Sequence, residues 1–105
     1  MNKWKVAITP DAASDIKSIY TYIADELHEK NTARKMSKRI IDEIKSLSDM
    51  PKRFPLYNIE PWNSRGLRKM LVGNFMVFYF TNDSVNEVAV FRVFYAGRNI
   101  EEMLK

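Results

Sequence analysis

The chain has 105 residues, a length that suits a single domain with one modest hydrophobic core. It contains no cysteine, which excludes a disulfide framework and thiolate chemistry. The formal net charge of +4 favours an anionic partner, either nucleic acid or an acidic protein surface.

The excess positive charge is concentrated in one segment. Between Lys52 and Lys69 there are five basic residues and one acidic residue, whereas the remainder of the chain carries 12 of each and cancels. We see no signal peptide and no apolar run long enough to span a bilayer. We therefore expect one cytoplasmic domain, residues 1–105, with no membrane contact.

The first half of the chain predicts a strand and two helices. Residues 4–9 alternate in polarity, as in a strand with one buried face. Thr9, Pro10 and Asp11 then suit a helix start, as cap, first helical residue and carboxylate at the positive end of the dipole. Two stripes with three- and four-residue steps predict an antiparallel helical hairpin. The first stripe is Ala13, Ile16, Ile19, Tyr20, Ile23 and Leu27; the second, capped by Asn31 or Thr32 and ended by Pro51, is Ala33, Met36, Ile40, Ile44 and Leu47.

The second half predicts a loop followed by a sheet. Residues 51–65 hold three prolines without a clean period, which indicates a long ordered loop. Segments 67–72, 75–80 and 87–95 are rich in β-branched and aromatic residues and are separated by short turns, which predicts an antiparallel meander. A helical turn at 99–104 is expected to end the chain. The fold class is therefore α+β, ordered β-α-α-β-β-β: a short N-terminal strand and an antiparallel two-helix hairpin packed on an antiparallel meander sheet.

Both faces of the predicted meander are largely apolar, whereas two helices can cover only one face. Simple alternation places Arg92 on the same face as Val88, Val90 and Phe94. We expect the loop of residues 51–65, here called the middle loop, to cover part of the second face. A partner chain is expected to cover the rest, because large exposed apolar patches usually mark interaction sites. The alternative is a loop that closes this face completely.

Two arginines near the C-terminus are expected to differ in kind. Arg92 lies within a strand, either as a structural residue paired with a carboxylate or an aromatic ring, or as an anion-binding residue beside Arg68. Arg98 follows Gly97, beyond the regular strand, and is expected to be exposed. The tail after it is expected to be free to dock as a small apolar anchor.

The stretches "GLRKMLVGNFMVFYF" and "VFRVFYAGRNIEEML", together with "ITPDAASDIKSIYTYIAD" and "IKSLSDMPKRFPLY", give a resemblance to a known family. Nearly the whole chain resembles the ParE/RelE superfamily of bacterial type II toxins. The resemblance implies the toxin of a plasmid-stabilisation or addiction module. It also implies a cognate acidic antitoxin that neutralises the toxin in a hetero-oligomer, on an apolar surface whose residues the sequence does not identify.

The resemblance leaves two targets open. ParE-like toxins inhibit DNA gyrase and are not enzymes, whereas RelE-like toxins cleave mRNA on the ribosome. Relatives that cleave RNA usually have a basic residue where this chain has Met76, and often a histidine before the residue matching Tyr95, where this chain has Phe94. The ParE-like reading is therefore favoured, with ribosome-dependent RNA cleavage as the alternative and a non-toxic protein-binding adaptor as a third possibility.

Candidate residues for target binding form a basic set: Arg65, Arg68, Lys69, Arg92, Tyr95 and Arg98. No catalytic residue is identified. The single histidine, His28, lies at the end of the first helix and is interpreted as solvent-exposed. No cofactor is expected, and no metal site is expected because histidine and carboxylate residues do not cluster in the sequence.

Overall fold

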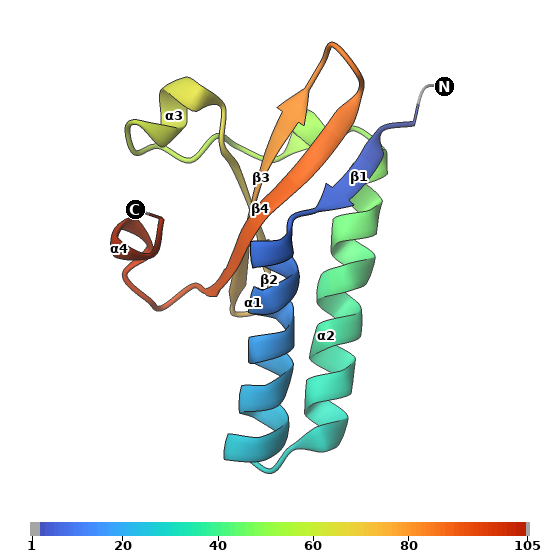
Figure 1. The fold of residues 1–105 in the computed structure, drawn as a ribbon, viewed down its shortest axis with the longest axis vertical. Coiled ribbons are helices and arrows are strands. Elements are labelled where there is room, and N and C mark those ends of the chain that lie inside the picture. The colour runs from blue at the N-terminus through green and yellow to red at the C-terminus, as the bar shows by residue number, and fades with distance from the viewer. Residues whose placement is uncertain (1–2, 105) are drawn as a thin grey trace.

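A mixed four-stranded sheet packs against a two-helix hairpin in the computed structural model, which describes residues 3–104 (Figure 1). The elements are β1 (Lys5–Ile8), α1 (Pro10–Thr21), α2 (Lys30–Lys45), α3 (Trp62–Arg65), β2 (Arg68–Val72), β3 (Phe75–Asn82), β4 (Glu87–Tyr95) and α4 (Ile100–Met103). A π-helical segment (Tyr22–Glu26) extends α1, and 3-10 turns at Ser46–Ser48 and Pro51–Arg53 follow α2.

The sheet confirms the predicted meander and changes its topology at one edge. The strand order is β1-β4-β3-β2, with β2, β3 and β4 antiparallel as expected. The N-terminal strand is not separate from the meander: β1 lies parallel to β4, with Lys5 opposite Glu87 and Ile8 opposite Val90. The sheet is therefore mixed. The connection from β1 to β4 runs through both helices, the middle loop, β2 and β3, and so has the length that a parallel pair needs.

The start of α1 is as predicted, whereas the bounds of α2 differ. The Thr9 hydroxyl accepts a 3.1 Å hydrogen bond from the Ala12 amide and caps α1. Neither Asn31 nor Thr32 caps α2, which begins at Lys30 after Glu29 with no side-chain cap. The left-handed backbone of His28, with φ of 54°, reverses the chain one residue before the cap position and starts the helix early.

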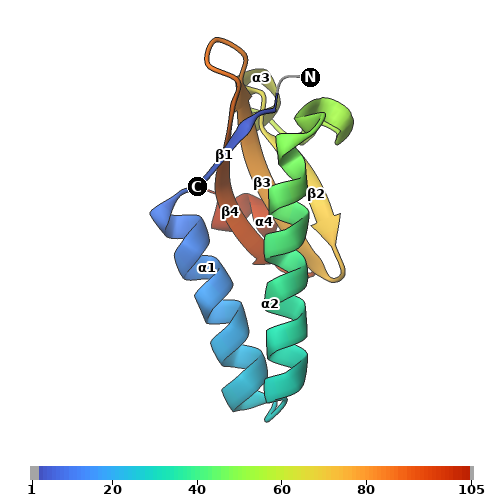
Figure 2. The same cartoon turned by 90° about the vertical axis from the view of Figure 1, so that its right-hand side faces the viewer.

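The helical hairpin extends past one end of the sheet (Figure 2). The predicted stripe of α1 holds through Ile16 and Ile23 but is wrong at both ends. Ala12 is buried in place of Ala13, and Leu27 is 52% exposed because it lies where no strand remains beneath the hairpin. The second helix packs as expected, through Ala33, Ile40 and Ile44.

A β-bulge in β4 overturns the predicted grouping of its side chains. Phe78 pairs with Arg92 and Tyr79 with Val90, so Phe91 is an extra residue. The extra residue shifts the alternation by one. Val88, Val90 and Val93 consequently pack in the core beneath the helices, and Phe94 joins the opposite face.

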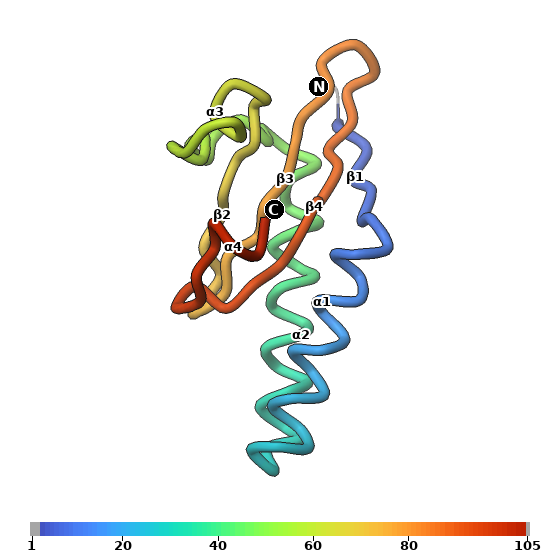
Figure 3. Tube along the Cα trace, turned by 60° about the vertical axis from the view of Figure 1, so that its left-hand side comes forward, coloured from blue at the N-terminus to red at the C-terminus, as the bar shows by residue number. Residues whose placement is uncertain are grey.

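The second face of the sheet is covered by the chain itself. Figure 3 shows α3 and α4 on the side away from the helical hairpin. Beneath them lies an aromatic core with Leu67, Phe78, Phe94 and Leu104 at its centre, packed by residues of the middle loop and the tail. The expectation of a large unfilled face for a partner is therefore wrong, and so is the expectation of a free tail, because Leu104 is only 3% exposed.

Candidate target-binding surface

Arg92 is held by a carboxylate. Its Nε and Nη2 donate hydrogen bonds of 2.7 and 2.9 Å to the two oxygens of Asp15 on α1, and its guanidinium lies 4.5 Å from the centre of the Phe94 ring. Both side chains are mostly buried, with 26% and 14% of their surface exposed. The hydrogen bond to Asp15 raises the pKa of the Arg92 guanidinium, so this arginine keeps its charge.

The position of this pair follows from the lengths of two strands. β1 ends at Ile8 while β4 continues to Tyr95, so the main chain of β4 beyond Val90 has no neighbouring strand on that edge. Thr9 donates its hydroxyl to the Phe91 carbonyl at 3.1 Å, and Asp15 accepts from the Val93 amide at 2.9 Å. The pair therefore seals an open sheet edge, a role in structure more than in target binding.

Arg68 fixes the middle loop. Its Nη1 donates to the Phe54 carbonyl at 2.7 Å and to the Lys52 carbonyl at 3.3 Å. The loop also pairs with β2 through a Leu56–Arg68 bridge and a 3.1 Å bond from the Lys69 amide to the Pro55 carbonyl. These contacts cover the outer edge of β2 at its first residues.

Arg65 is exposed and Lys69 is half-buried, and each lies beside an aromatic ring. The guanidinium of Arg65 lies 5.4 Å from the centre of the Trp62 ring, and the ammonium of Lys69 lies 5.9 Å from the centre of the Tyr57 ring. Burial raises the pKa of the Tyr57 hydroxyl, and the nearby Glu101 carboxylate adds to the effect. Neither cation forms an ion pair within residues 3–104, so both remain available to an anionic partner.

Tyr95 and Arg98 lie at the other end of the sheet. Arg68 is level with Val90 in the register, whereas Val72 is level with Tyr95. Four residues of strand separate the two levels, or about 13 Å. The Tyr95 ring packs edge-on against Phe75 at 5.9 Å and is 49% exposed, and Arg98 is exposed, as predicted.

Gly97 is required for this arrangement of Tyr95. A Cβ at position 97 would lie 2.6 Å from the Tyr95 ring, inside any allowed contact. The six predicted residues therefore do not form one site: Arg92 and Arg68 are engaged in the fold, Arg65 and Lys69 lie beside the middle loop, and Tyr95 and Arg98 lie at the far end.

A groove of about 630 Å³ lies where the middle loop meets the end of β3. Its lining residues come from the middle loop with α3, from the start of β2, from the end of β3 and the turn after it, and from β4: Lys52, Leu56, Arg65, Gly66, Arg68, Phe80, Thr81, Asn82, Asp83, Glu87 and Ala89. Lys52 forms a 2.6 Å ion pair with Asp83. Arg65 and Arg68 have no acidic partner among the described residues, so one wall of the groove is cationic.

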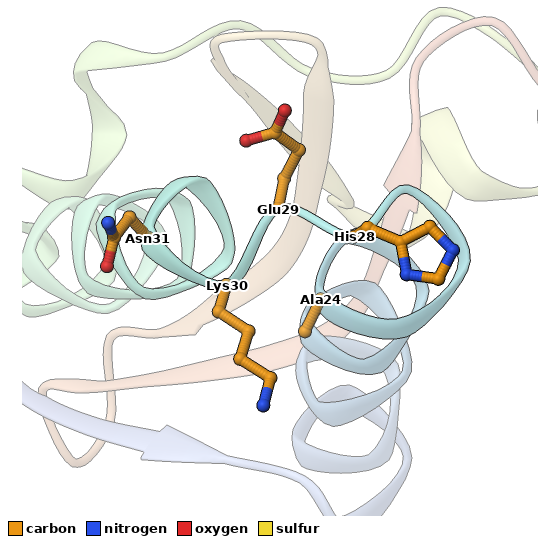
Figure 4. Close-up of a pocket in the computed structure, with 5 residues that line it drawn as sticks. All are labelled: Ala24, His28, Glu29, Lys30 and Asn31. Carbon is orange, nitrogen blue, oxygen red and sulfur yellow. The ribbon is translucent and has the colours of Figure 1, made fainter.

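A second hollow lies at the connection between α1 and α2, and the side chains that line it do not point toward one another (Figure 4). It is lined by Ala24, His28, Glu29, Lys30 and Asn31. In Figure 4 the Glu29 and Lys30 side chains extend in opposite directions, and the His28 ring turns away from both. No group of three or more potential metal-binding side chains occurs within residues 3–104. No helix in that part of the chain is long and apolar enough to cross a bilayer.

Sequence reasoning missed one residue that organises the surface. Asp15 was not singled out, although a carboxylate beside the buried stripe of a helix is a partner that a strand arginine needs.

One family model matches nearly the whole chain. Residues 6–100 match the model of the ParE toxin of type II toxin–antitoxin systems. The chain belongs to this family. No curated protein sequence matches the chain.

Solved structures of toxin–antitoxin systems share the fold at low sequence identity. A chain of the chromosomal ParDE system of Pseudomonas aeruginosa matches with a TM-score of 0.72 and 19% identity, over 90% of this chain and 98% of that one. A chain of the RelBE complex of Mycobacterium tuberculosis matches with a TM-score of 0.67 and 16% identity, over 89% and 98%. A chain of the archaeal RelE–RelB complex of Pyrococcus horikoshii matches with a TM-score of 0.58 and 16% identity, over 93% and 99%. ParE-like and RelE-like toxins thus share this fold, so the fold does not distinguish a gyrase target from a ribosomal one.

Proposed function

We propose that this ParE-family toxin arrests growth in the cytoplasm by binding and inhibiting DNA gyrase, and that a cognate acidic antitoxin neutralises it in a hetero-oligomer. The observation that carries the choice of target is the dispersal of the candidate residues. Arg92 is paired with Asp15, Arg68 with loop carbonyls, and Tyr95 lies about four residues of strand away from Arg68.

RNA cleavage requires groups that donate and accept protons within hydrogen-bond reach of one phosphate. It also requires cations directed at the charge that develops on that phosphate. The dispersed residues suit protein binding better than this chemistry. The family match to ParE toxins favours the same target.

Four of the predicted residues are available for target contact in this proposal. Arg65 offers an exposed guanidinium and Lys69 a half-buried ammonium beside the middle loop, and Tyr95 and Arg98 offer an aromatic ring and a guanidinium at the far end. Aromatic and arginine side chains carry much of the binding energy at protein interfaces. Arg68 and Arg92 support the surface from within the fold.

The test uses the purified chain in two assays. In a supercoiling assay, the protein is expected to inhibit gyrase, and an Arg98→Glu variant is expected to inhibit less at equal concentration. In a ribosome-primed assay, the same protein is expected to leave mRNA intact. Cleavage of mRNA without gyrase inhibition would assign the protein to the ribosome-dependent class instead.

A further inference from the structure

The two helices of the hairpin carry opposite charges. α2 contains six basic and two acidic residues, whereas α1 and the π-helical segment after it contain one basic and four acidic residues. A surface that only has to be soluble usually mixes both signs. None of the residues proposed to contact the target lies on α2, so the positive charge of this helix has no role in the proposed function.

Five cations of α2 form one exposed stripe. At 3.6 residues per turn, positions 34, 38 and 45 lie within about 40° of one another around the helix axis, and positions 35 and 39 form a second row beside them. α2 lies beside α1 and over the sheet (Figure 2), and the side away from both is exposed. The basic stripe is about 17 Å long and consists of Arg34, Lys35, Lys38, Arg39 and Lys45.

Little in the fold neutralises the basic stripe. Lys38 forms a 2.7 Å ion pair with Asp42, and 77% and 54% of these two side chains are exposed. An ion pair this exposed contributes little to stability, so Lys38 can exchange Asp42 for another anion. The other four cations of the stripe form no ion pair among residues 3–104. Most of the positive charge of α2 is therefore available to a partner.

Gly73 leaves room for the border of the stripe next to the sheet. Arg39 reaches the turn between β2 and β3, where a Cβ on Gly73 would lie 3.3 Å from its Nη1 and 3.2 Å from the Cε of Met36. Gly73 also has a positive φ of 59°, which glycine adopts readily. The cationic surface therefore extends from α2 to this turn.

The chemistry of the basic stripe indicates which class of anionic partner it fits. Within α2, the position between its cations is occupied by Asp42 and by no apolar or aromatic side chain. The centre of a protein–protein interface, in contrast, is depleted in charge and enriched in aromatic residues. Single-stranded nucleic acids are bound largely by stacking of their bases on aromatic rings. Duplex DNA presents one phosphate charge per about 1.7 Å of its axis, or about ten over the length of the stripe, and therefore fits best.

We propose that the basic stripe of α2 binds the phosphate backbone of duplex DNA without reading its sequence. The four cations without an ion pair would each contact a phosphate, and Lys38 would add a contact on leaving Asp42. Phosphate contacts position a protein on DNA and carry no sequence information directly. In complex with gyrase, the stripe would also hold the toxin on the DNA that gyrase carries, a consequence that rests on the proposed function.

Fluorescence anisotropy of a labelled duplex of about 20 base pairs measures binding of the purified full chain between about 50 and about 200 mM salt. The logarithm of the association constant is expected to fall with the logarithm of the salt concentration with a slope of about −3.5, because about four phosphates are neutralised. Duplexes of two unrelated sequences are expected to bind equally. No binding at the lowest salt concentration, or tighter binding of a single strand of the same length, would overturn the inference. Equally tight binding of a polyglutamate peptide of the same charge would assign the stripe to acidic proteins and overturn it as well.

A matched pair of charge reversals distinguishes the stripe from net charge. Lys35→Glu changes the stripe, and Lys17→Glu makes the same change at an exposed position of α1. Lys35→Glu is expected to weaken duplex binding at least about fivefold and to make the salt dependence shallower by about one unit of slope. Lys17→Glu is expected to have less than about a twofold effect, because salt screens distant charges. Unchanged binding in Lys35→Glu, or an equal loss in Lys17→Glu, would overturn the inference.

Two further measurements locate the bound duplex and verify the variants. In a titration of the ¹⁵N-labelled chain, the duplex is expected to shift the amide resonances of residues 34–45 most strongly. Shifts centred on the middle loop would assign DNA binding to that segment and overturn the inference. Melting curves verify that Lys35→Glu and Lys17→Glu are folded, as expected for exposed positions.

The gyrase assay separates this inference from the proposed function. Duplex binding through residues 34–45 in a protein that does not inhibit gyrase would refute the proposed target and leave the DNA-binding assignment intact. Gyrase inhibition by a protein that fails the duplex test would refute only the DNA-binding assignment.

Discussion

The two faces of the sheet are closed in different ways. The helix-facing core is mainly aliphatic, with Ile40, Ile44 and Val90 completely buried beneath two regular helices. The opposite core is mainly aromatic, with Phe78 and Phe94 covered by an irregular loop and a short tail. Helices with a periodic apolar stripe can therefore be assigned to one face of the sheet from the sequence. The face that a loop or a tail covers is known only from the folded structure.

The same comparison separates the candidate binding residues. Those held between layers, Arg68 and Arg92, have fixed partners on neighbouring elements. Those at the ends of the aromatic face, Arg65 and Arg98, are exposed. Substitutions can therefore test whether the helix-facing side carries more of the stability and the other side more of the binding.

The largest effect is expected from Ile40→Ala. Ile40 has no exposed surface at the centre of the helix-facing core. Its truncation should lower the free energy of unfolding by about 2–5 kcal/mol, because the rigid surroundings leave a cavity. Chemical denaturation measures this change, with Ala13→Gly on the exposed side of α1 as a control for general destabilisation of the hairpin. A loss below about 1 kcal/mol would show that the helices are not the principal cover of the core.

A pH titration is expected to have the next largest effect, through Tyr79. Its hydroxyl donates a 2.5 Å hydrogen bond to the Pro51 carbonyl, and burial raises its pKa to about 12 from the ordinary value of 10. The protonated form is thus favoured by folding, and the resulting stabilisation is present below pH 10 and lost as the pH rises through 12. The loss should amount to about 2–3 kcal/mol.

Denaturation at several pH values between 9 and 12.5 measures this loss. Tyr79→Phe is the control, since it lacks the titrating group while keeping the ring. The stability difference between the wild-type protein and this variant should change across that range, and a constant difference would contradict the assignment.

Arg92→Ala is expected to lower the free energy of unfolding by about 1–3 kcal/mol, because it leaves the mostly buried Asp15 carboxylate without its partner. A double-mutant cycle with Asp15→Asn measures the coupling. Additive effects of the two substitutions would contradict a stabilising interaction of this pair between α1 and β4.

Leu104→Ala tests the aromatic face, where the tail adds a buried residue at 3% exposure. We expect a loss of about 1–2 kcal/mol, less than for Ile40→Ala, because a short terminal segment can detach without unfolding the sheet. Hydrogen exchange measured beside thermal melting distinguishes local from global opening. A loss equal to that of Ile40→Ala would place both cores in one cooperative unit.

The smallest effect is expected from Arg65→Ala. The side chain is exposed and its guanidinium lies over the Trp62 ring, 5.4 Å from the ring centre. The change in the free energy of unfolding should stay within about 0.5 kcal/mol, whereas gyrase inhibition should fall. A folded variant with full inhibitory activity would remove Arg65 from the target surface.

Periodicity and turn chemistry in the sequence by themselves determined the element order, the hairpin and the meander. Alternating strands and helical stripes are local patterns, and Thr9, Pro10 and the Gly73–Asn74 turn act within a few residues of themselves. They also predicted that Arg92 and Arg98 would differ in burial, because one lies within a strand and the other after a glycine.

Only the tertiary structure decided how the sheet is completed and where its open edges lie. The parallel pairing of β1 with β4, the bulge at Phe91 and the docking of Leu104 all join residues distant in sequence. Asp15 gains its role from such a pairing, because β1 ends before β4 does. Local patterns specify which residues are apolar or charged, but the lengths of neighbouring strands specify which main-chain groups remain unpaired.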